Sequence, residues 1–456
     1  MIKIRFLFLL LLLIGCAKEH HKIQWITIDP GHFHAALVQK TMYPEIDPKV
    51  PIYAPKSSDL DLHLKRIEVY NLREINPTSW ELKTYAGSDF FETFLKNEKE
   101  GVVMLSGNNQ KKTDYILNAV KNGFHVYADK PMVIIPEAFK KLEAAFEIAK
   151  ENQLLIYDIM TERSEITTVL QKELSKMERV FGSLIKGTKD TPAILKSSTH
   201  HFSKQVSGQP LIRPAWFFDS QQQGEGLVDV SSHLVDLVFW ESFPEQAIEK
   251  EELKLIHAER WATPLSKVDF EKVTSLKNYP DYLKQYLKRD SLFVHSNGSI
   301  NFTLKGHHAK VEVIWNFEAP EGTGDTHYSI MRGSKATLEI VQGPDEKYIP
   351  SLYINPISEL NPNNLKKAVE SLSKKYSGIG LTKSGDRWKV VIPKELRKGH
   401  EAHFAAVTRR FIQYYNAQKL PNWEVTNILS KYYLTTLALS YALESSERKL
   451  NFKENP

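Results

Sequence analysis

The chain has 456 residues, and removing the first 15, which carry Lys3 and Arg5, leaves 441 residues with a net charge of +3. A domain usually takes about 100–200 residues, so this length predicts two or three domains, and 42% apolar residues are enough for their cores. The 60 basic and 55 acidic residues disfavour nucleic-acid binding, because neutralising phosphates requires concentrated positive charge. A single cysteine excludes an intramolecular disulfide framework and metal sites built from several cysteines.

The N-terminal segment has the pattern of an export signal. A short basic start precedes a continuous apolar run over residues 6–14, which is too short to span a bilayer as a helix. The run ends in Leu13-Ile14-Gly15-Cys16, which is similar to a bacterial lipobox and implies that Cys16 is the lipidated first residue of the mature chain. The alternatives are a plain signal peptide with an incidental cysteine and an N-terminal anchor helix. We expect residues 1–15 to be a lipoprotein signal peptide and residues 16–22 to be a linker.

From residue 23 onward, short apolar runs alternate with helical periodicity, which is typical of βαβ units around a parallel sheet. The predicted strands are Gln24–Ile28, Val50–Tyr53, Gly101–Leu105, His125–Ala128 and Leu154–Tyr157. The predicted helices are His32–Lys40, Lys112–Asn122 and the amphipathic Pro136–Glu151. We therefore predict a doubly wound α/β domain over residues 23–160.

Beyond residue 161 the pattern changes to a helix followed by alternating strands, which favours an antiparallel sheet. The predicted elements are helix Ser164–Lys176 and strands Ala193–Ser197, Ile300–Leu304, Lys310–Phe317, Tyr328–Arg332 and Ala336–Val341. Two segments, near 245–289 and 344–385, have the composition of insertions. The chain ends in two predicted helices, His403–Asn416 and Trp423–Ser445. We predict an α+β domain over residues 161–456, with a large and mostly antiparallel sheet.

The turn after the first predicted strand reads Asp29-Pro30-Gly31-His32-Phe33-His34. A dinucleotide site needs close approach of the backbone to a pyrophosphate at a helix N-terminus, which is why three glycines usually stand there. Gly31 is the one that remains, with Asp29 and His34 at the first and third positions. The turn is therefore either a degenerate dinucleotide fingerprint or an ordinary strand-to-helix turn. The acidic residue that usually holds the ribose arrives late, at Asp59, so the choice between NAD and NADP is open.

Two further strand ends carry polar side chains. Ser106-Gly107-Asn108-Asn109 stands at the carboxyl end of a buried strand, where open α/β sheets bind ligands. Lys130 follows Asp129 at another strand end, and Pro131 keeps the lysine out of helical geometry and aims it at the cleft. A surface lysine is the alternative interpretation. The candidate cofactor-binding residues are Asp29, Gly31, His32, Phe33, Ser106, Asn108, Asn109 and Lys130.

A third motif combines an acid with a histidine. Asp229 and His233 are four residues apart, which predicts that they lie one above the other on a single helix face. A carboxylate one turn away raises the basicity of a histidine and orients its ring, which suits a base that removes a hydroxyl proton while hydride leaves the same carbon. Asp236 continues this stripe. The alternative is a structural histidine in the core.

Two of these motifs together resemble the glucose–fructose oxidoreductase, inositol dehydrogenase and rhizopine-catabolism family (Gfo/Idh/MocA). The segment Val126-Tyr127-Ala128-Asp129-Lys130-Pro131 is similar to the Glu-Lys-Pro strand end of that family. Trp216-Phe217-Phe218-Asp219 and the following Asp229-x-x-x-His233 are similar to its second motif. The resemblance spans roughly residues 24–448. It implies a Rossmann-like first domain and a second domain whose open-faced sheet binds substrate and forms homo-oligomers.

The resemblance implies an NAD(P)-dependent oxidoreductase that acts on a hydroxyl of a sugar, glycoside or polyol. His233 would take the proton, Asp229 would orient it, and Lys130 would steady the oxygen as it becomes a carbonyl. His201, Trp216 and Asp236 are expected to bind substrate, and no metal site is expected. Weaker candidates for a sugar pocket are His200, the pair His307-His308, and Asp325 with His327.

Export bears on the choice of reaction, because a free nicotinamide pool is not expected outside the cytoplasm. A second variant therefore retains the cofactor in redox-neutral chemistry, in which transient oxidation to a keto sugar permits elimination of a glycosidic group before the hydride returns. A non-catalytic carbohydrate-binding lipoprotein on the same fold is the alternative. A hydrolase with two carboxylates is a weaker one, because no such pair is identified. We expect an exported bacterial lipoprotein, anchored through Cys16 to the cell membrane or outer membrane and facing the periplasm.

Overall fold

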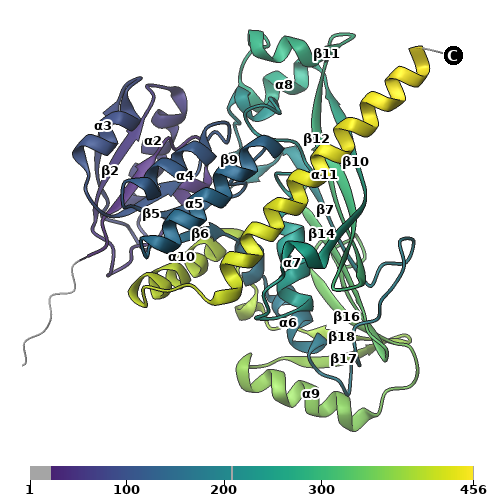
Figure 1. Cartoon of the computed structure of the whole chain (residues 1–456). Helices are drawn as coiled ribbons and strands as arrows, with labels where there is room; N and C mark the ends of the chain where they lie inside the picture. The colour runs from purple at the N-terminus through teal and green to yellow at the C-terminus, as the bar shows by residue number, and fades with distance from the viewer. Residues whose placement is uncertain (1–21, 207–208, 455–456) are drawn as a thin grey trace, which may run out of the picture.

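The computed structural model describes residues 22–206 and 209–454, which form two domains side by side with the long C-terminal helix running between them (Figure 1). The predicted signal peptide and Cys16 lie outside the described residues, so the lipid anchor stays a prediction. Within the described ranges, no helix combines the length and the apolar character needed to cross a membrane.

The first domain is built around a parallel sheet whose described strands run in the order β3-β2-β1-β4-β5-β6. This order confirms the predicted doubly wound, Rossmann-like fold. Strands β1, β4 and β6 are buried along their whole length, which explains their nearly continuous apolar sequences. The strands are β1 Trp25–Ile28, β2 Lys49–Ala54, β3 Glu81–Ala86, β4 Val102–Leu105, β5 His125–Asp129 and β6 Ile156–Ile159. The helices are α1 His34–Val38, α2 Ser58–Leu72, α3 Phe90–Asn97, α4 Lys112–Lys121 and α5 Phe139–Glu151.

The sequence patterns do not reveal α2, β3 and α3. Strand β3 lies at the edge of the sheet and most of its side chains are at least partly exposed. Helix α2 buries few of its residues. Both elements therefore lack the apolar periodicity by which buried elements are found.

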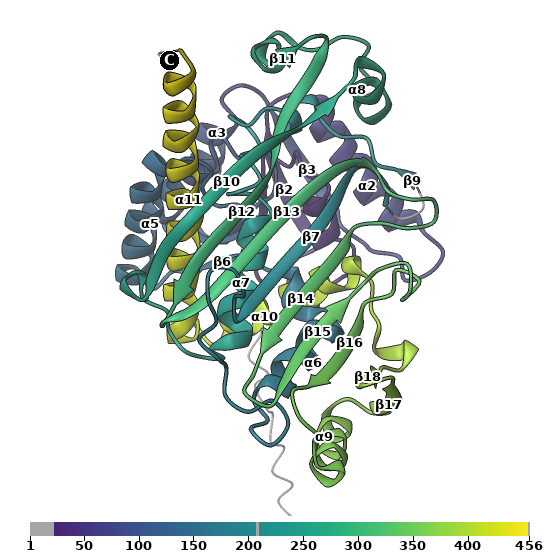
Figure 2. The ribbon, with the colours of Figure 1, turned by 90° about the vertical axis from the view of Figure 1, so that its right-hand side faces the viewer.

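The second domain carries one large sheet, drawn face-on in Figure 2 with the first domain behind it. Its described strands run in the order β10-β12-β13-β7-β14-β15-β16-β18-β17. Only the β13–β7 pair is parallel in this described sheet, which confirms the mostly antiparallel prediction. The strands are β7 Ile194–Ser203, β10 Leu253–Leu265, β12 Ser291–Leu304, β13 His307–Glu318, β14 Thr326–Arg332, β15 Ala336–Val341, β16 Ser351–Pro356, β17 Gly380–Ser384 and β18 Arg387–Val391, with the two-residue β8 Gln205–Val206, β9 Gln209–Pro210 and β11 Leu287–Lys288. The helices are α6 Ile166–Ser175, α7 Ser231–Ser242, α8 Lys267–Thr274 and α9 Pro362–Lys375.

The two segments expected as insertions contribute strands to the two edges of this sheet. Segment 245–289 supplies β10, and its pairing with β12 shifts register twice, between Leu255 and His257 and between Trp261 and Thr263. Each shift interrupts the two-residue alternation that marks a strand in sequence. Segment 344–385 supplies β16 and β17 and also α9.

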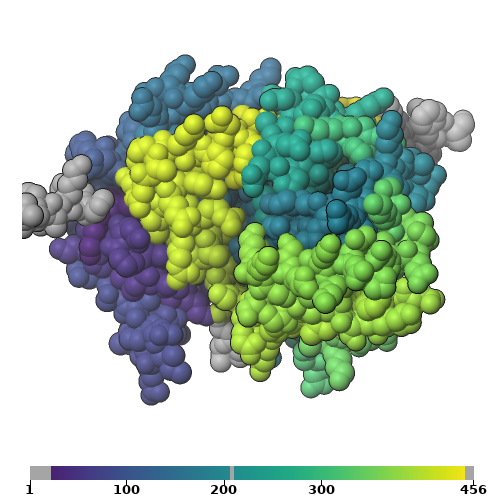
Figure 3. Space-filling view, turned by 90° about the horizontal axis from the view of Figure 1, so that it is seen from below, coloured from purple at the N-terminus to yellow at the C-terminus, as the bar shows by residue number. Residues whose placement is uncertain are grey.

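The C-terminal helices α10 (His400–Asn416) and α11 (Asn422–Glu454) connect the two domains. Phe404 and Phe411 of α10 belong to the core on one face of the first sheet. On α11, Tyr432 belongs to the core on the other face of that sheet, whereas Leu439 belongs to the core of the second domain. Figure 3 shows the yellow C-terminal residues between the purple first domain and the teal and green second domain.

Candidate active site

A cavity of about 770 Å³ lies between the two domains. Its wall is formed by the turn after β1, the end of β5, the start of α7, strands β7 and β14, and the segment that leads into α10. Five cationic and five anionic side chains line it, so opposite charges balance in its wall. This volume is in the range of pockets that hold small molecules, roughly 300–1,000 Å³.

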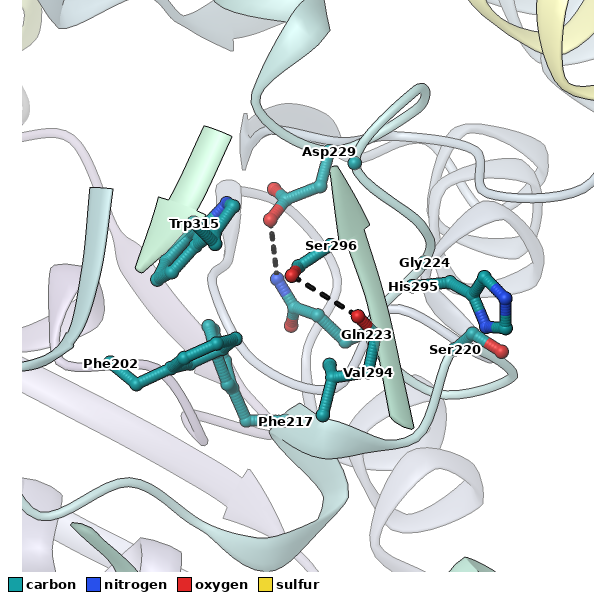
Figure 4. A pocket seen from close by; sticks show the side chains of 11 residues that line it. Phe202, Phe217, Ser220, Gln223, Gly224, Asp229, Val294, His295, Ser296 and Trp315 are labelled. Atoms are coloured by element: carbon teal, nitrogen blue, oxygen red, sulfur yellow. Dashed lines mark hydrogen bonds between the residues drawn. The ribbon is translucent and has the colours of Figure 1, made fainter. Parts of the chain in front are cut away.

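Lys130 and Asp229 meet in this wall from opposite domains. The Nζ of Lys130, at the end of β5, donates a hydrogen bond to Oδ1 of Asp229 at 2.6 Å. Oδ2 of Asp229 accepts from Nε2 of Gln223 at 2.9 Å, as Figure 4 shows. Burial alone would lower the pKa of Lys130, but Asp229 and Asp129 outweigh it and raise the pKa above its ordinary value. Lys130 is therefore a fixed ammonium that faces the cavity.

His233 lies in the same wall, but it is not paired with Asp229 as predicted. Helix α7 begins at Ser231, so Asp229 stands in the turn before it and uses both carboxylate oxygens for Lys130 and Gln223. Nδ1 of His233 is buried, with no hydrogen-bond partner among the described residues. Burial, and then the charge of Lys130, lower the pKa of His233 well below its ordinary value. The imidazole is therefore neutral at pH 7, the form that a proton acceptor needs, although the lowered pKa makes it a weaker base.

The turn after β1 departs from a dinucleotide-binding turn. Helix α1 has 5 residues, and Asp29 has a positive φ of 46° at the position of the first glycine. Burial, and then Asp59, raise the pKa of Asp29 to about 6. The turn packs directly on the one after β4: the N–H of His32 donates to the carbonyl of Ser106 at 3.2 Å, and a Cβ on Gly107 would lie 1.9 Å from the carbonyl oxygen of Asp29.

Trp216 packs against this turn and links it to the residue after β2 that usually holds a ribose. Its Cζ2 would be 3.1 Å from a Cβ on Gly31, and its Nε1 donates to Oδ2 of Asp59 at 2.6 Å. Nδ2 of Asn108 donates to Gln222 at 2.7 Å, and Nδ2 of Asn109 donates to the carbonyl of Gln223 at 2.8 Å. A dinucleotide laid across these two turns does not fit this conformation. The indole of Trp216 packs against Gly31 and does not line the cavity as the described residues outline it, so its role in substrate binding stays a prediction.

The predicted cofactor residues divide into two groups. His32, Phe33 and Lys130 line the cavity. The others lie behind its wall, in the contact between the two turns and residues 216–223; they are Asp29, Gly31, Ser106, Asn108 and Asn109.

Two histidines converge on Asp129 beside Lys130. Oδ2 of Asp129 lies 2.9 Å from Nδ1 of His34 and 3.8 Å from Nδ1 of His32, and it accepts from Oγ of Ser106 at 2.9 Å. Burial would raise the pKa of Asp129, but the two histidines and Lys112 hold it well below its ordinary range. No sequence pattern indicates this group, because its members follow β1 and end β5, with β4 between the two strands.

Two further residues predicted to bind substrate, His201 and Asp236, do not line the cavity as the described residues outline it. His200 lines the cavity, whereas His201 is buried behind it, with its Nδ1 3.4 Å from Asp325, the carboxylate that His200 also contacts. Asp236 is 2% exposed and lies in an ion network between the domains. Nε and Nη2 of Arg163 bond its two oxygens at 2.6 and 2.7 Å, and Nζ of Lys431 lies 3.2 Å away. Asp236 therefore joins the domains and does not contact the cavity that the described residues outline.

The side of the cavity formed by the second sheet is polar and aromatic. Asp325 accepts from Nδ1 of His200 at 3.0 Å and also from Lys204. The ring of His200 stacks on Trp315 with 5.1 Å between centroids, and Arg213 lies 5.3 Å from that indole. Asp325, His327 and His200 were weaker sequence candidates, and all three line the cavity, whereas His307 and His308 do not line it in the described structure. Trp315, Arg213 and Lys204 had no sequence signal.

Glu162 in the cavity wall predicts a pH effect on stability. Burial, and then the charge of Glu165, raise its pKa from 4.5 to about 7. Because the folded state disfavours the ionised form, wild-type protein loses stability as the pH rises from about 4.5 through about 7. We expect Glu162→Gln to have a higher Tm than wild type at pH 8 and an equal Tm at pH 4.5, measured by calorimetry. The exposed Glu147→Gln should show no such difference; an equal response of both variants would contradict the raised pKa.

Comparison with known proteins identifies the family. Residues 170–443 match the family described as "Putative oxidoreductase C terminal domain". A crystal structure of a "putative oxidoreductase" from Parabacteroides merdae is 48% identical, covers 93% of this chain and 98% of its own, and superposes with a TM-score of 0.90. A search of curated proteins found no match.

More distant structures share the fold. KijD10, a 3-ketoreductase from Actinomadura kijaniata solved with NADP and TDP-benzene, is 14% identical over 92% of this chain and 98% of its own, with a TM-score of 0.56. A "putative oxidoreductase" from Thermotoga maritima is 13% identical over 92% and 98% of the two chains, with a TM-score of 0.58. The chain is therefore an enzyme of the oxidoreductase family that its C-terminal domain defines, with the Gfo/Idh/MocA-type fold that its sequence resembles.

Proposed function

We propose that this oxidoreductase interconverts a hydroxyl and a carbonyl of a sugar, glycoside or polyol, and that Lys130, Asp229 and His233 handle the proton at the reacting oxygen. The observation that carries the proposal is the Lys130–Asp229 pair, 2.6 Å apart, in the wall of a cavity of about 770 Å³. His233 lines the same wall. A fixed ammonium and a neutral imidazole together offer a proton donor and a proton acceptor to one oxygen.

The rest of the lining supports a polyhydroxylated substrate. Charged side chains of both signs provide donors and acceptors for hydroxyl groups, and Trp315 with His200 provides a flat aromatic surface for the apolar face of a sugar ring. The 3-ketoreductase KijD10 shares the fold, and its reaction type supports a hydroxyl–carbonyl interconversion.

The protein residues have distinct tasks in the oxidation direction. Lys130 donates a hydrogen bond to the substrate oxygen and stabilises the negative charge that develops there, while Asp229 and Gln223 fix its position. His233 takes the hydroxyl proton. The hydrogen on carbon leaves with its electron pair as hydride, for which NAD or NADP remains the acceptor that the sequence predicts. Because the indole of Trp216 packs against Gly31 and donates to Asp59, a dinucleotide that contacts both residues requires movement of residues 215–223 or another placement.

The experiment is a substrate screen that does not depend on knowing the acceptor. The full-length protein is incubated with sugars, glycosides and polyols together with NAD⁺, NADP⁺ or an artificial electron acceptor, and products are identified by mass spectrometry. We expect a product about 2 Da lighter than its substrate, or an elimination product if the chemistry is redox-neutral. Binding without any conversion would favour the carbohydrate-binding alternative, and simple hydrolysis would contradict the proposal.

A further inference from the structure

His32, His34 and Asp129 bring three metal-binding atoms together at the edge of the cavity. Within the described residues this is the one group of three histidine, cysteine or carboxylate side chains whose ligand atoms all lie within 4.8 Å of one another. Two members come from the turn after β1 and the third from the end of β5. His32 and His34 also line the cavity, so a cation held there would be accessible to a substrate.

The ring nitrogen of His32 in this group has only a long hydrogen bond. The backbone N–H of His34 donates to Nδ1 of His32 at 3.4 Å, a long hydrogen bond that occupies the lone pair of this ring nitrogen. Oδ2 of Asp129, also an acceptor, faces it at 3.8 Å. A cation between these two atoms would replace the long hydrogen bond to His32 and attract both the ring nitrogen and the carboxylate.

The spacing suits a first-row transition metal. Bonds of about 2.0–2.2 Å place neighbouring ligand atoms roughly 3–3.5 Å apart. The distances from Oδ2 of Asp129, 2.9 Å to His34 and 3.8 Å to His32, lie on either side of this range, so small side-chain rotations suffice. The hydroxyl of Ser106 donates to the same carboxylate oxygen at 2.9 Å and orients it, as outer hydrogen bonds do in metal sites.

We propose that His32, His34 and Asp129 bind a divalent transition-metal cation with open coordination positions toward the cavity. Two imidazoles and one carboxylate suit Zn²⁺, Fe²⁺, Co²⁺ or Mn²⁺. The cation would act as a Lewis acid that polarises a hydroxyl or carbonyl oxygen of the substrate beside Lys130. This metal site goes beyond the proposed function. Metal binding is measured without a substrate, so it can be disproved while the proposed reaction stands, and the reverse.

The test is metal content. Full-length protein without a histidine tag is loaded with Zn²⁺ or Co²⁺, passed through a desalting column and analysed by inductively coupled plasma mass spectrometry. We expect about one metal ion per chain, and for Co²⁺ the visible d–d bands of a nitrogen–oxygen site. In His32→Ala and in His34→Ala the affinity should fall about tenfold or more. The control His257→Ala removes a histidine that also faces a carboxylate, Glu259 at 2.9 Å, but at the surface, and should keep the metal.

Two results would overturn the proposed metal site. Wild-type protein that retains less than about 0.1 metal ion per chain overturns the proposal, as does retention of metal by both cavity variants at wild-type affinity. Circular dichroism identifies a variant that fails to fold. In that case the Co²⁺ spectrum of wild-type protein decides alone, because d–d bands that match a site without imidazole ligands would also overturn the assignment.

Discussion

Replacing Lys130 with methionine is expected to lower kcat/KM for the substrate found in the screen by about 10²–10³-fold, the usual contribution of a positioned hydrogen-bond donor to charge that develops on oxygen. The methionine keeps most of the side-chain volume but removes the ammonium that Asp229 holds at 2.6 Å. The loss should appear mainly in kcat, because charge on the substrate oxygen is greatest in the transition state. Steady-state kinetics measure both constants.

The matched control is Lys141→Met. Lys141 also forms a lysine–aspartate pair, with Asp114 at 2.7 Å, but both side chains are about half exposed on the surface. This variant should keep wild-type kinetics. A Lys130→Met enzyme within about threefold of wild type in kcat/KM would remove Lys130 from the chemistry.

Arg163→Met is expected to lower the free energy of unfolding by about 3–5 kcal/mol, the usual cost of removing one partner of a buried ion pair. Arg163 is 3% exposed and bonds Asp236 with two nitrogens and Glu424 with a third, at 2.7 Å. Without the guanidinium, two carboxylates between the domains lose their main counter-charge. Lys431 still contacts Asp236, but its ammonium also donates a hydrogen bond to Asp158 at 2.6 Å.

Urea unfolding followed by tryptophan fluorescence measures this effect. Lys141→Met serves again as the control, because breaking an exposed ion pair costs about 0–1 kcal/mol. A loss of less than 1 kcal/mol in Arg163→Met would mean that the network between the domains contributes little to stability.

Much of the fold was predictable because buried parallel strands are recognisable in sequence. Strands β1, β4 and β5 are short apolar runs followed by polar strand ends, and they appear where the sequence predicts them. Strand β3 was missed because it is exposed at an edge, and β10 because two register shifts break its alternation. Domain boundaries near residue 160 stay a prediction, and α11 contributes to the cores of both domains.

The sequence predicts which residues line the site better than it predicts which of them contact one another. Sequence motifs predict the catalytic residues Lys130, Asp229 and His233, and all three line one cavity. The predicted pairing of Asp229 with His233 is wrong, because helix α7 begins at Ser231, two residues after Asp229. The group that His32 and His34 form with Asp129 depends on the order of the strands in the first sheet, which no local sequence pattern indicates.

The most direct test of the account is a crystal structure of the Lys130→Met variant with the substrate from the screen. We predict a sugar or polyol in the cavity between the domains, with its reacting oxygen within hydrogen-bond distance of His233 and next to residue 130. Substrate bound elsewhere, such as on the outer face of the large sheet, would contradict it.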